Sequence, residues 1–313
     1  MQPFLRLFCG WVAGLSLAAA TMLATSATAH AATVQSATPT PVGPVAASET
    51  RYTNGMNIVT EQTDTDKLIA MDHVQNLRDL GGLIGANGHR IAPHRLYRSG
   101  NPALGTPADF ARLASLQLDD VVDFRATSEK TSAEAAFAER FPWIADPVLA
   151  GDLSPASVVP MLKRSTPQQM HQFMVDLYRR FPQDYQPQFA RFLKLAEADK
   201  TLLYHCTAGK DRTGFATVLL LSALGVDRAT VMANYLESNR HNAAGNARAV
   251  AQLQKIGVEP EVVQPLLNVD PDYIGAAMEV IDTRYGGMQH YLTDVLHVDV
   301  EKIRRGYLVA VTE

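Results

Sequence analysis

The stretch HCTAGKDRTG, residues 205–214, contains one of the two cysteines of the 313-residue chain. Cys206 stands six residues before Arg212, between the apolar runs KTLLYHC (200–206) and RTGFATVLLLSALG (212–225). The first run is typical of a buried strand and the second of a buried helix. A loop that leads from a strand into a helix directs free backbone N–H groups, and the positive end of the helix dipole, at one point. The stretch therefore predicts an anion site with a thiol beside it.

The residue types in this loop suit nucleophilic chemistry on a phosphate ester. The field that attracts an anion also favours the thiolate form of Cys206, which is the nucleophile. The planar fork of Arg212 can hold two phosphate oxygens while their charge changes. Gly209 permits a close turn, Gly214 permits close packing where the helix begins, and Thr213 can donate its hydroxyl to the sulfur.

A lone cysteine is often only a small buried apolar residue, and a cysteine six residues before an arginine is a weak pattern. The complete pattern H-C-x-x-G-x-x-R-T-G is much more specific, and it is similar to the signature of the cysteine-dependent protein tyrosine phosphatases. Further motifs are NLRDLGG (76–82), YRSG (97–100), DFRATSE (123–129), NYLESN (234–239) and RYGGMQHYL (284–292). With them the chain resembles one branch, the bacterial and often secreted tyrosine phosphatases that also act on phosphoserine/threonine and phosphoinositides. The resemblance covers roughly residues 70–310.

The resemblance implies a tyrosine-phosphatase-like α/β fold with a central, mostly parallel sheet flanked by helices and a helix-rich C-terminal half. It also implies a hydrolase without metal or other cofactor, in which Cys206 attacks phosphorus and water releases the phosphate. Arg212 and the loop amides would stabilise the phosphate oxygens. The expected phosphate-binding residues are Thr207, Ala208, Gly209, Lys210 and Thr213.

The general acid that protonates the leaving oxygen is less clear from the sequence, and three aspartates are candidates. Asp211 is favoured, because this branch usually has an aspartate there, although it could instead cap the following helix. Asp152 in AGDLS could lie on a mobile loop. Asp123 in VVDFR is the third candidate, although next to Arg125 it could form a structural ion pair.

Other charged residues of these motifs have two interpretations each. Lys210 suits a substrate with more than one phosphate or an acidic headgroup, unless it is a solvated loop lysine. His205 is expected to be a buried residue that orients the loop, with a direct part in the reaction as the alternative. Arg98 and Arg125 could line the mouth of the pocket or pair with nearby carboxylates.

The elements that must position the loop alternate between strand and helix, which predicts an α/β layered domain. Residues 161–181 could be a surface helix or a lid that shields the thiolate. The predicted strands are 94–100, 118–125, 142–151 and 200–206, and the predicted helices are 106–117, 165–181, 212–225, 227–256, 259–268, 271–285 and 299–310.

The N-terminal region predicts export. An apolar run follows Arg6 and ends in small-x-small cleavage patterns, so residues 1–31 are expected to be a signal peptide, with an uncleaved membrane anchor as the alternative. Residues 32–66 have linker composition, and 67–313 are the expected phosphatase domain. The mature protein would then be periplasmic or secreted and would keep Cys206 as its one cysteine.

The composition excludes little else. With 47% hydrophobic residues the chain can bury a core, and a net charge of −4 gives no general attraction for nucleic acid or anionic membranes. The expected partners are phosphorylated proteins or phosphoinositides, without nucleic acid and without stable membrane association once the signal is cleaved. Three rival functions stay open: a rhodanese-type sulfur transferase, a non-catalytic phospho-ligand binding module, and a phytase-like enzyme.

Overall fold

The computed structural model of the chain describes residues 67–148 and 155–311. The predicted signal peptide (1–31), the predicted linker (32–66) and Asp152 lie outside these residues.

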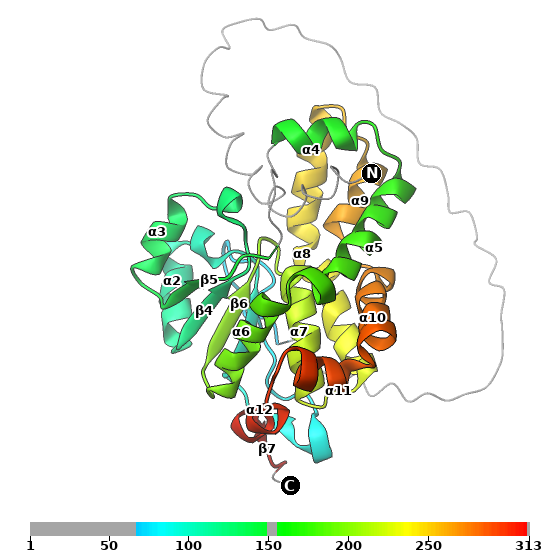
Figure 1. The fold of residues 1–313 in the computed structure, drawn as a ribbon. Helices are drawn as coiled ribbons and strands as arrows, with labels where there is room; N and C mark the ends of the chain where they lie inside the picture. The colour runs from blue at the N-terminus through cyan, green and yellow to red at the C-terminus, as the bar shows by residue number, and fades with distance from the viewer. Residues whose placement is uncertain (1–66, 149–154, 312–313) are drawn as a thin grey trace, which may run out of the picture.

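A five-stranded sheet forms the centre of the fold (Figure 1). Its order is β1 (Arg78–Asp79), β3 (Leu96–Ser99), β6 (Leu202–His205), β4 (Asp120–Asp123) and β5 (Trp143–Ala145). β3, β6, β4 and β5 are parallel, and β1 pairs antiparallel with β3. All residues of β3, β6 and β4 are buried, as expected for parallel strands covered on both faces. The predicted mostly parallel α/β fold is confirmed.

Two apolar clusters lie on opposite faces of this sheet because successive strand residues alternate in direction. Leu203 of β6 and Val121 of β4 pack toward α2 (Pro107–Ser115) and α3 (Ala133–Ala138), with Leu113 and Phe137. Their neighbours Tyr204 and Val122 belong to the larger cluster on the other face.

Helices α6 (Gln186–Glu197), α7 (Arg212–Ala223) and α12 (Val300–Tyr307) pack against one another on that second face. Behind them, α7 contacts the long α8 (Arg228–Lys255). This arrangement places α7, the helix that follows the motif loop, in the middle of the molecule (Figure 1).

The remaining helices form an outer group around α5 (Pro167–Asp184), which packs on α9 (Pro260–Leu267) and α10 (Pro271–Tyr285). Thr166 caps α5 in a capping box with Gln169, as the Thr-Pro signal predicts. The smaller elements are α4 (Pro155–Leu162), α11 (Met288–His290), a π-helical turn (Tyr291–Val295), β2 (Arg90–Ile91), β7 (Leu308–Val309) and 3₁₀ turns at Ala86–Gly88, Pro102–Leu104 and Thr127–Glu129.

Three predicted boundaries are wrong. The last helix ends at Tyr307 rather than 310, because Leu308–Val309 pair with β2. Of the predicted strand 142–151, Trp143–Ala145 form β5, and residues 149–151 lie outside the described residues. Residues 161–181 are not one element, since α4 ends at Leu162 and α5 begins at Pro167. One face of α5 is buried in the core, with Met170, Met174, Tyr178 and Phe181.

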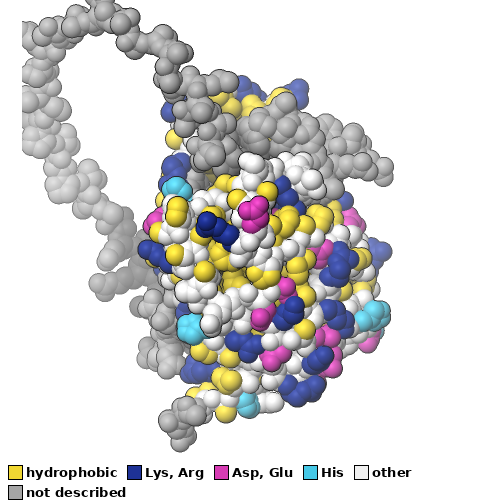
Figure 2. Space-filling view, turned by 90° about the vertical axis from the view of Figure 1, so that its left-hand side faces the viewer, with side chains coloured by type: hydrophobic (Ala, Val, Ile, Leu, Met, Phe, Trp, Pro, Cys, Tyr) yellow, Lys and Arg dark blue, Asp and Glu magenta, His cyan; other side chains and the backbone are white. Residues whose placement is uncertain are grey.

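Surface charge is mixed on the face that Figure 2 shows, where Lys/Arg and Asp/Glu side chains are interspersed. None of the helices within 67–148 and 155–311 combines the length and the apolar character that a membrane span requires.

Candidate active site

The motif loop connects the central strand β6 to the buried helix α7. Cys206 directly follows β6 and is 1% exposed, and α7 begins at Arg212. α7 is buried on all sides, which explains its almost continuous apolar sequence. The predicted strand–loop–helix arrangement is therefore confirmed.

The loop carbonyls accept hydrogen bonds from two residues of distant motifs, Asn76 and Arg98, and from Asn242 of α8. Asn76 Nδ2 donates to the carbonyl oxygens of Ala208 (3.2 Å) and Gly209 (2.9 Å). Arg98 donates to the carbonyl of Gly209 at 2.7 Å, and Asn242 donates to that of Ala208 at 3.1 Å. Arg98 thus positions the loop from within the fold, because its side chain is fully buried.

These bonds fix the direction of the loop amides. The backbone N–H of Asn101 also donates to the carbonyl of Thr207, at 3.0 Å. In a trans peptide the N–H points opposite to the C=O, and the described chain contains no cis peptide. The N–H groups of Ala208, Gly209 and Lys210 therefore point away from the residues that hold the carbonyls. Successive amides directed to one side are the geometry of an anion-binding nest.

Two glycines are required by this geometry. Gly209 has φ +66°, and a Cβ there would lie 2.3 Å from the carbonyl oxygen of Ser99. A Cβ at Gly214 would lie 3.1 Å from the ring of Tyr235, so the glycine lets this ring pack against the start of α7.

Arg212 is held by a carboxylate that the sequence did not assign to it. Its two terminal nitrogens lie 2.6 and 2.9 Å from the two carboxylate oxygens of Glu129, and both side chains are almost fully buried. Thr207 Oγ1 donates to the same carboxylate at 2.7 Å. Burial would raise the pKa of Glu129, but the charge and hydrogen bonds of Arg212 and the bond from Thr207 lower it. This fork-to-fork pair fixes the plane of the guanidinium beside the loop.

Asp123 and Arg125 form a separate buried ion pair. Arg125 donates to both oxygens of Asp123 (3.0 and 2.8 Å) and also contacts Glu134 at 2.9 Å. Burial would raise the pKa of Asp123, but the charges of His205 and Arg125 and the hydrogen bonds lower it to about 2. Asp123 therefore has the surroundings of a structural carboxylate rather than of a proton donor.

His205 lies under the loop, as expected. It is 1% exposed, and its Nδ1 lies 3.9 Å from Asp123 Oδ1. Burial is the main reason that its pKa is lowered to about 4, so the ring is neutral near pH 7.

Asp211 is the candidate acid that the structure places in the loop. It is 5% exposed, and its Oδ1 accepts hydrogen bonds from Tyr178 and from Lys210, each at 2.8 Å. It makes no side-chain cap bond to α7, so the capping alternative is not realised. Lys210 is 4% exposed, so the alternative of a solvated loop lysine is wrong. Asp152 lies outside the described residues.

The hydroxyl of Thr213 does not make the hydrogen bond that the sequence predicts. It is buried and has no hydrogen-bond partner among the described residues, so the bond to the sulfur of Cys206 is not formed in this structure.

One group of side chains in the described ranges has the spacing of metal ligands, which the sequence did not suggest. Ligand atoms of His171, Asp270 and Asp272 lie within 4.8 Å of one another. The group belongs to α5 and the start of α10 and is not part of the motif loop, and Asp270 already caps α10.

Comparison with known proteins places this site in a family. A model of the tyrosine phosphatase family matches residues 69–309. A Cupriavidus necator protein that is named as a tyrosine-protein phosphatase is 52% identical over 240 residues, which cover 77% of this chain and 88% of the relative.

Two further likenesses are more limited. The triple specificity protein phosphatase PtpB of Mycobacterium tuberculosis is 38% identical over 135 residues, covering 39% of this chain and 49% of the relative. Among solved structures, P. aeruginosa TpbA is 17% identical and aligns over 61% of this chain and 89% of its own, with a TM-score of 0.23. The family match over most of the chain, together with the Cys206–Arg212 loop, shows that the chain belongs to the tyrosine phosphatase family, within the cysteine-dependent protein tyrosine phosphatases.

Proposed function

We propose that the chain hydrolyses phosphate monoesters through a cysteinyl-phosphate intermediate on Cys206. The observation that supports this most strongly is the way the loop is held. The carbonyls of Thr207, Ala208 and Gly209 accept hydrogen bonds from residues outside the loop, and Arg212, at the end of the loop, is paired with Glu129. An incoming phosphate would find amide donors and a guanidinium already oriented, which is electrostatic preorganisation.

The chemistry divides into two steps. The sulfur of Cys206 forms a bond to phosphorus while the bond to the leaving oxygen breaks, and Asp211 gives that oxygen a proton. Water then attacks phosphorus, the P–S bond breaks, and the resulting carboxylate of Asp211 accepts a proton from the water. Arg212 and the loop amides hold the equatorial oxygens in both steps. The loop itself supplies the positive charge, so we propose that the reaction needs no metal ion.

The proposed substrates are phosphotyrosine proteins first, with phosphoserine/threonine and phosphoinositides as further substrates. The name of the mycobacterial relative, a triple specificity phosphatase, favours a broad range. Lys210 also favours it, because a second buried cation within the loop suits acidic or multiply phosphorylated substrates. We further propose that the protein is exported and acts in the periplasm or outside the cell.

The test is phosphate release by the purified protein under reductant and EDTA. p-Nitrophenyl phosphate, phosphotyrosine and phosphoserine/threonine peptides, a phosphoinositide and an inositol phosphate form the substrate panel. Wild type should turn over and Cys206→Ser should be inactive. Asp211→Asn should lose more activity on substrates with poor leaving groups than on p-nitrophenyl phosphate. Equal rates for wild type and Cys206→Ser would refute the mechanism and favour a binding module. Preference for the inositol phosphate would favour the phytase-like alternative.

A further inference from the structure

We propose that Tyr178 is a positioning residue for Asp211, and that Tyr235 in turn fixes the hydroxyl of Tyr178. The proposal rests on the proposed function, since it presupposes that Asp211 donates the proton to the leaving group.

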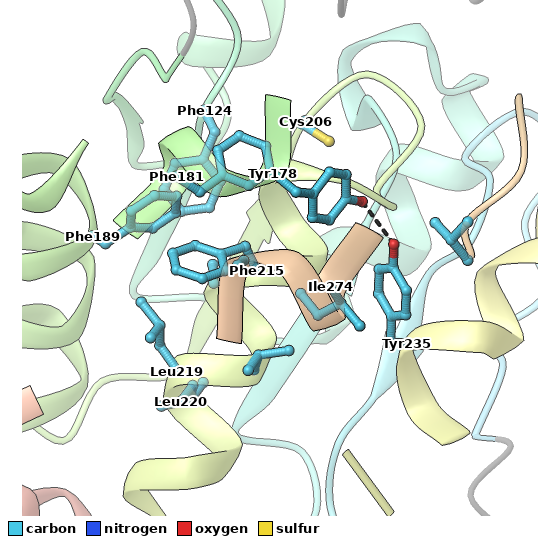
Figure 3. Close-up of a cluster of buried hydrophobic side chains, with 14 of the residues drawn as sticks. Phe124, Tyr178, Phe181, Phe189, Cys206, Phe215, Leu219, Leu220, Tyr235 and Ile274 are labelled. Atoms are coloured by element: carbon cyan, nitrogen blue, oxygen red, sulfur yellow. Dashed lines mark hydrogen bonds between the residues drawn. The ribbon is translucent and has the colours of Figure 1, made fainter. Parts of the chain in front are cut away.

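The three side chains form a hydrogen-bonded chain that runs from Tyr235 through Tyr178 to Asp211, and the two tyrosines belong to different helices. The hydroxyl of Tyr235, on α8, donates to the hydroxyl of Tyr178, on α5, at 2.9 Å (Figure 3). The hydroxyl of Tyr178 donates to Asp211 Oδ1 at 2.8 Å. Tyr178 is 0% exposed and Tyr235 is 1% exposed, so water does not compete for these bonds.

The direction of these hydrogen bonds follows from which groups can donate and which can only accept. Asp211 Oδ1 accepts whether the carboxyl group is ionised or carries its acidic proton on Oδ2, so the single proton of Tyr178 goes to Asp211 Oδ1, and the oxygen of Tyr178 accepts from Tyr235. Burial, followed by the charge of Asp211, raises the pKa of Tyr178 well above its usual value, and the same causes raise that of Tyr235. Both phenols therefore keep their protons and stay donors over the working pH range.

Ring packing fixes the position of Tyr178, whereas the other donor to Asp211, Lys210, has a side chain with more rotatable bonds. Tyr178 packs edge-on against Phe181 and Tyr235 and lies 5.7 Å, between ring centroids, from Tyr273. Lys210 reaches the same oxygen on a flexible four-carbon stem. Tyr178 therefore supplies the directional constraint on the carboxyl group, and Lys210 supplies charge. A proton donor must come within about 3 Å of the leaving oxygen, so a loss of orientation lowers the rate of proton transfer.

The sequence motifs do not mark this role. Tyr178 lies in the predicted helix 165–181, where its spacing from Met174 and Phe181 is that of an ordinary core residue. Its hydroxyl, rather than its ring, is the part that reaches the loop.

The test compares Tyr178→Phe with wild type on aryl and alkyl phosphates whose leaving groups are increasingly basic. A general acid matters most for the poorest leaving group, so the loss in kcat/KM should be small for p-nitrophenyl phosphate and about 10-fold for an alkyl phosphate. Asp211→Asn should show a steeper trend of the same sign. In the double variant, Tyr178→Phe should add no further loss, because there is no acid left to orient.

Tyr291→Phe is the matched control. Tyr291 is also fully buried, and its hydroxyl donates to the carbonyl of Pro182, a residue of α5 and not of the loop, at 2.9 Å. This variant should lose stability comparable to that of Tyr178→Phe while keeping the wild-type dependence on leaving group.

Several outcomes would overturn the proposal. If Tyr178→Phe lowers the rate equally for all leaving groups, or adds its full effect to Asp211→Asn, its role is only structural. If Asp211→Asn follows the proposed trend and Tyr178→Phe matches wild type, the inference fails while the proposed function stands. If Asp211→Asn has no effect, the acid assignment and this inference fail together. Should Tyr178→Phe not fold, Tyr235→Phe carries the same comparison, with a smaller expected slope.

Discussion

Replacing Glu129 by glutamine tests whether the buried carboxylate holds Arg212 in place. The substitution keeps the shape of the side chain but removes the charge that faces a guanidinium with 0% side-chain exposure. Removing one partner of a buried ion pair costs about 3–5 kcal/mol, and we expect about 3 kcal/mol here because the amide oxygen can still accept one bond. For a domain of this size, that corresponds to a fall in Tm of roughly 6–12 °C.

Activity should also fall, because the guanidinium loses its bidentate partner. A misplacement on the order of 1 Å costs about 100-fold in rate, so kcat/KM on p-nitrophenyl phosphate should drop by about 10- to 100-fold. The folded-state pKa of Glu129 is lowered from 4.5, so its contribution to stability is present above pH 4.5 and lost as the pH falls below it. The stability difference between wild type and variant should therefore shrink in acid.

Glu301→Gln is the control for this substitution, since Glu301 forms an exposed pair with Arg304 at 2.7 Å. An exposed pair of this kind contributes about 0.2–1 kcal/mol at most, so its loss should barely change urea unfolding. If Glu129→Gln is as stable as Glu301→Gln and retains kcat/KM within about threefold, Glu129 does not position Arg212 and the reasoning is refuted.

Three further predictions concern the support of the loop. Gly209→Ala should lower kcat/KM by about 100-fold or more, because its Cβ would meet the carbonyl oxygen of Ser99 at 2.3 Å; steady-state kinetics at near-normal activity would contradict this. Asn76→Ala removes one of the two side-chain donors to each of the carbonyls of Ala208 and Gly209 and should cost about 1 kcal/mol in urea unfolding, whereas no change would show that these bonds are dispensable. The pKa of His205 is about 4 in the fold, against 6.5 for an exposed histidine, so the unfolded state binds more protons between these values and stability should fall by about 3 kcal/mol from pH 6.5 to 4. His205→Gln should flatten that pH profile, and an unchanged profile would assign the acid sensitivity to other groups.

Local signals in the sequence were sufficient where the structure depends on neighbours in the chain. Thr106 and Thr166, each followed by proline, mark the starts of α2 and α5. α6 is absent from the predicted elements, although Pro187 and the spacing of Phe189, Phe192 and Leu193 are helical signals. The pairing of Leu308 with Ile91 could not be predicted, because nothing local distinguishes it from a continued helix.

The residues of the site also differ in whether they could be predicted from their neighbours in the sequence. Cys206 and Arg212 stand on one short loop, so their spacing alone indicates the chemistry. The partner of Arg212 is Glu129, 83 residues away, and the partner of Asp211 is Tyr178, 33 residues away. Such partners depend on how strands and helices meet in space, and the sequence offers other carboxylates and tyrosines of equal local merit.

The central claim is that Cys206 carries the phosphoryl group during turnover. The most direct measurement is a denaturing quench of the wild-type protein during turnover of p-nitrophenyl phosphate, followed by peptide mass spectrometry. The account predicts a phosphoryl group on the peptide that contains Cys206, and none on Cys206→Ser treated alike. A phosphoryl group on another residue, or turnover by Cys206→Ser at the wild-type rate, would contradict it.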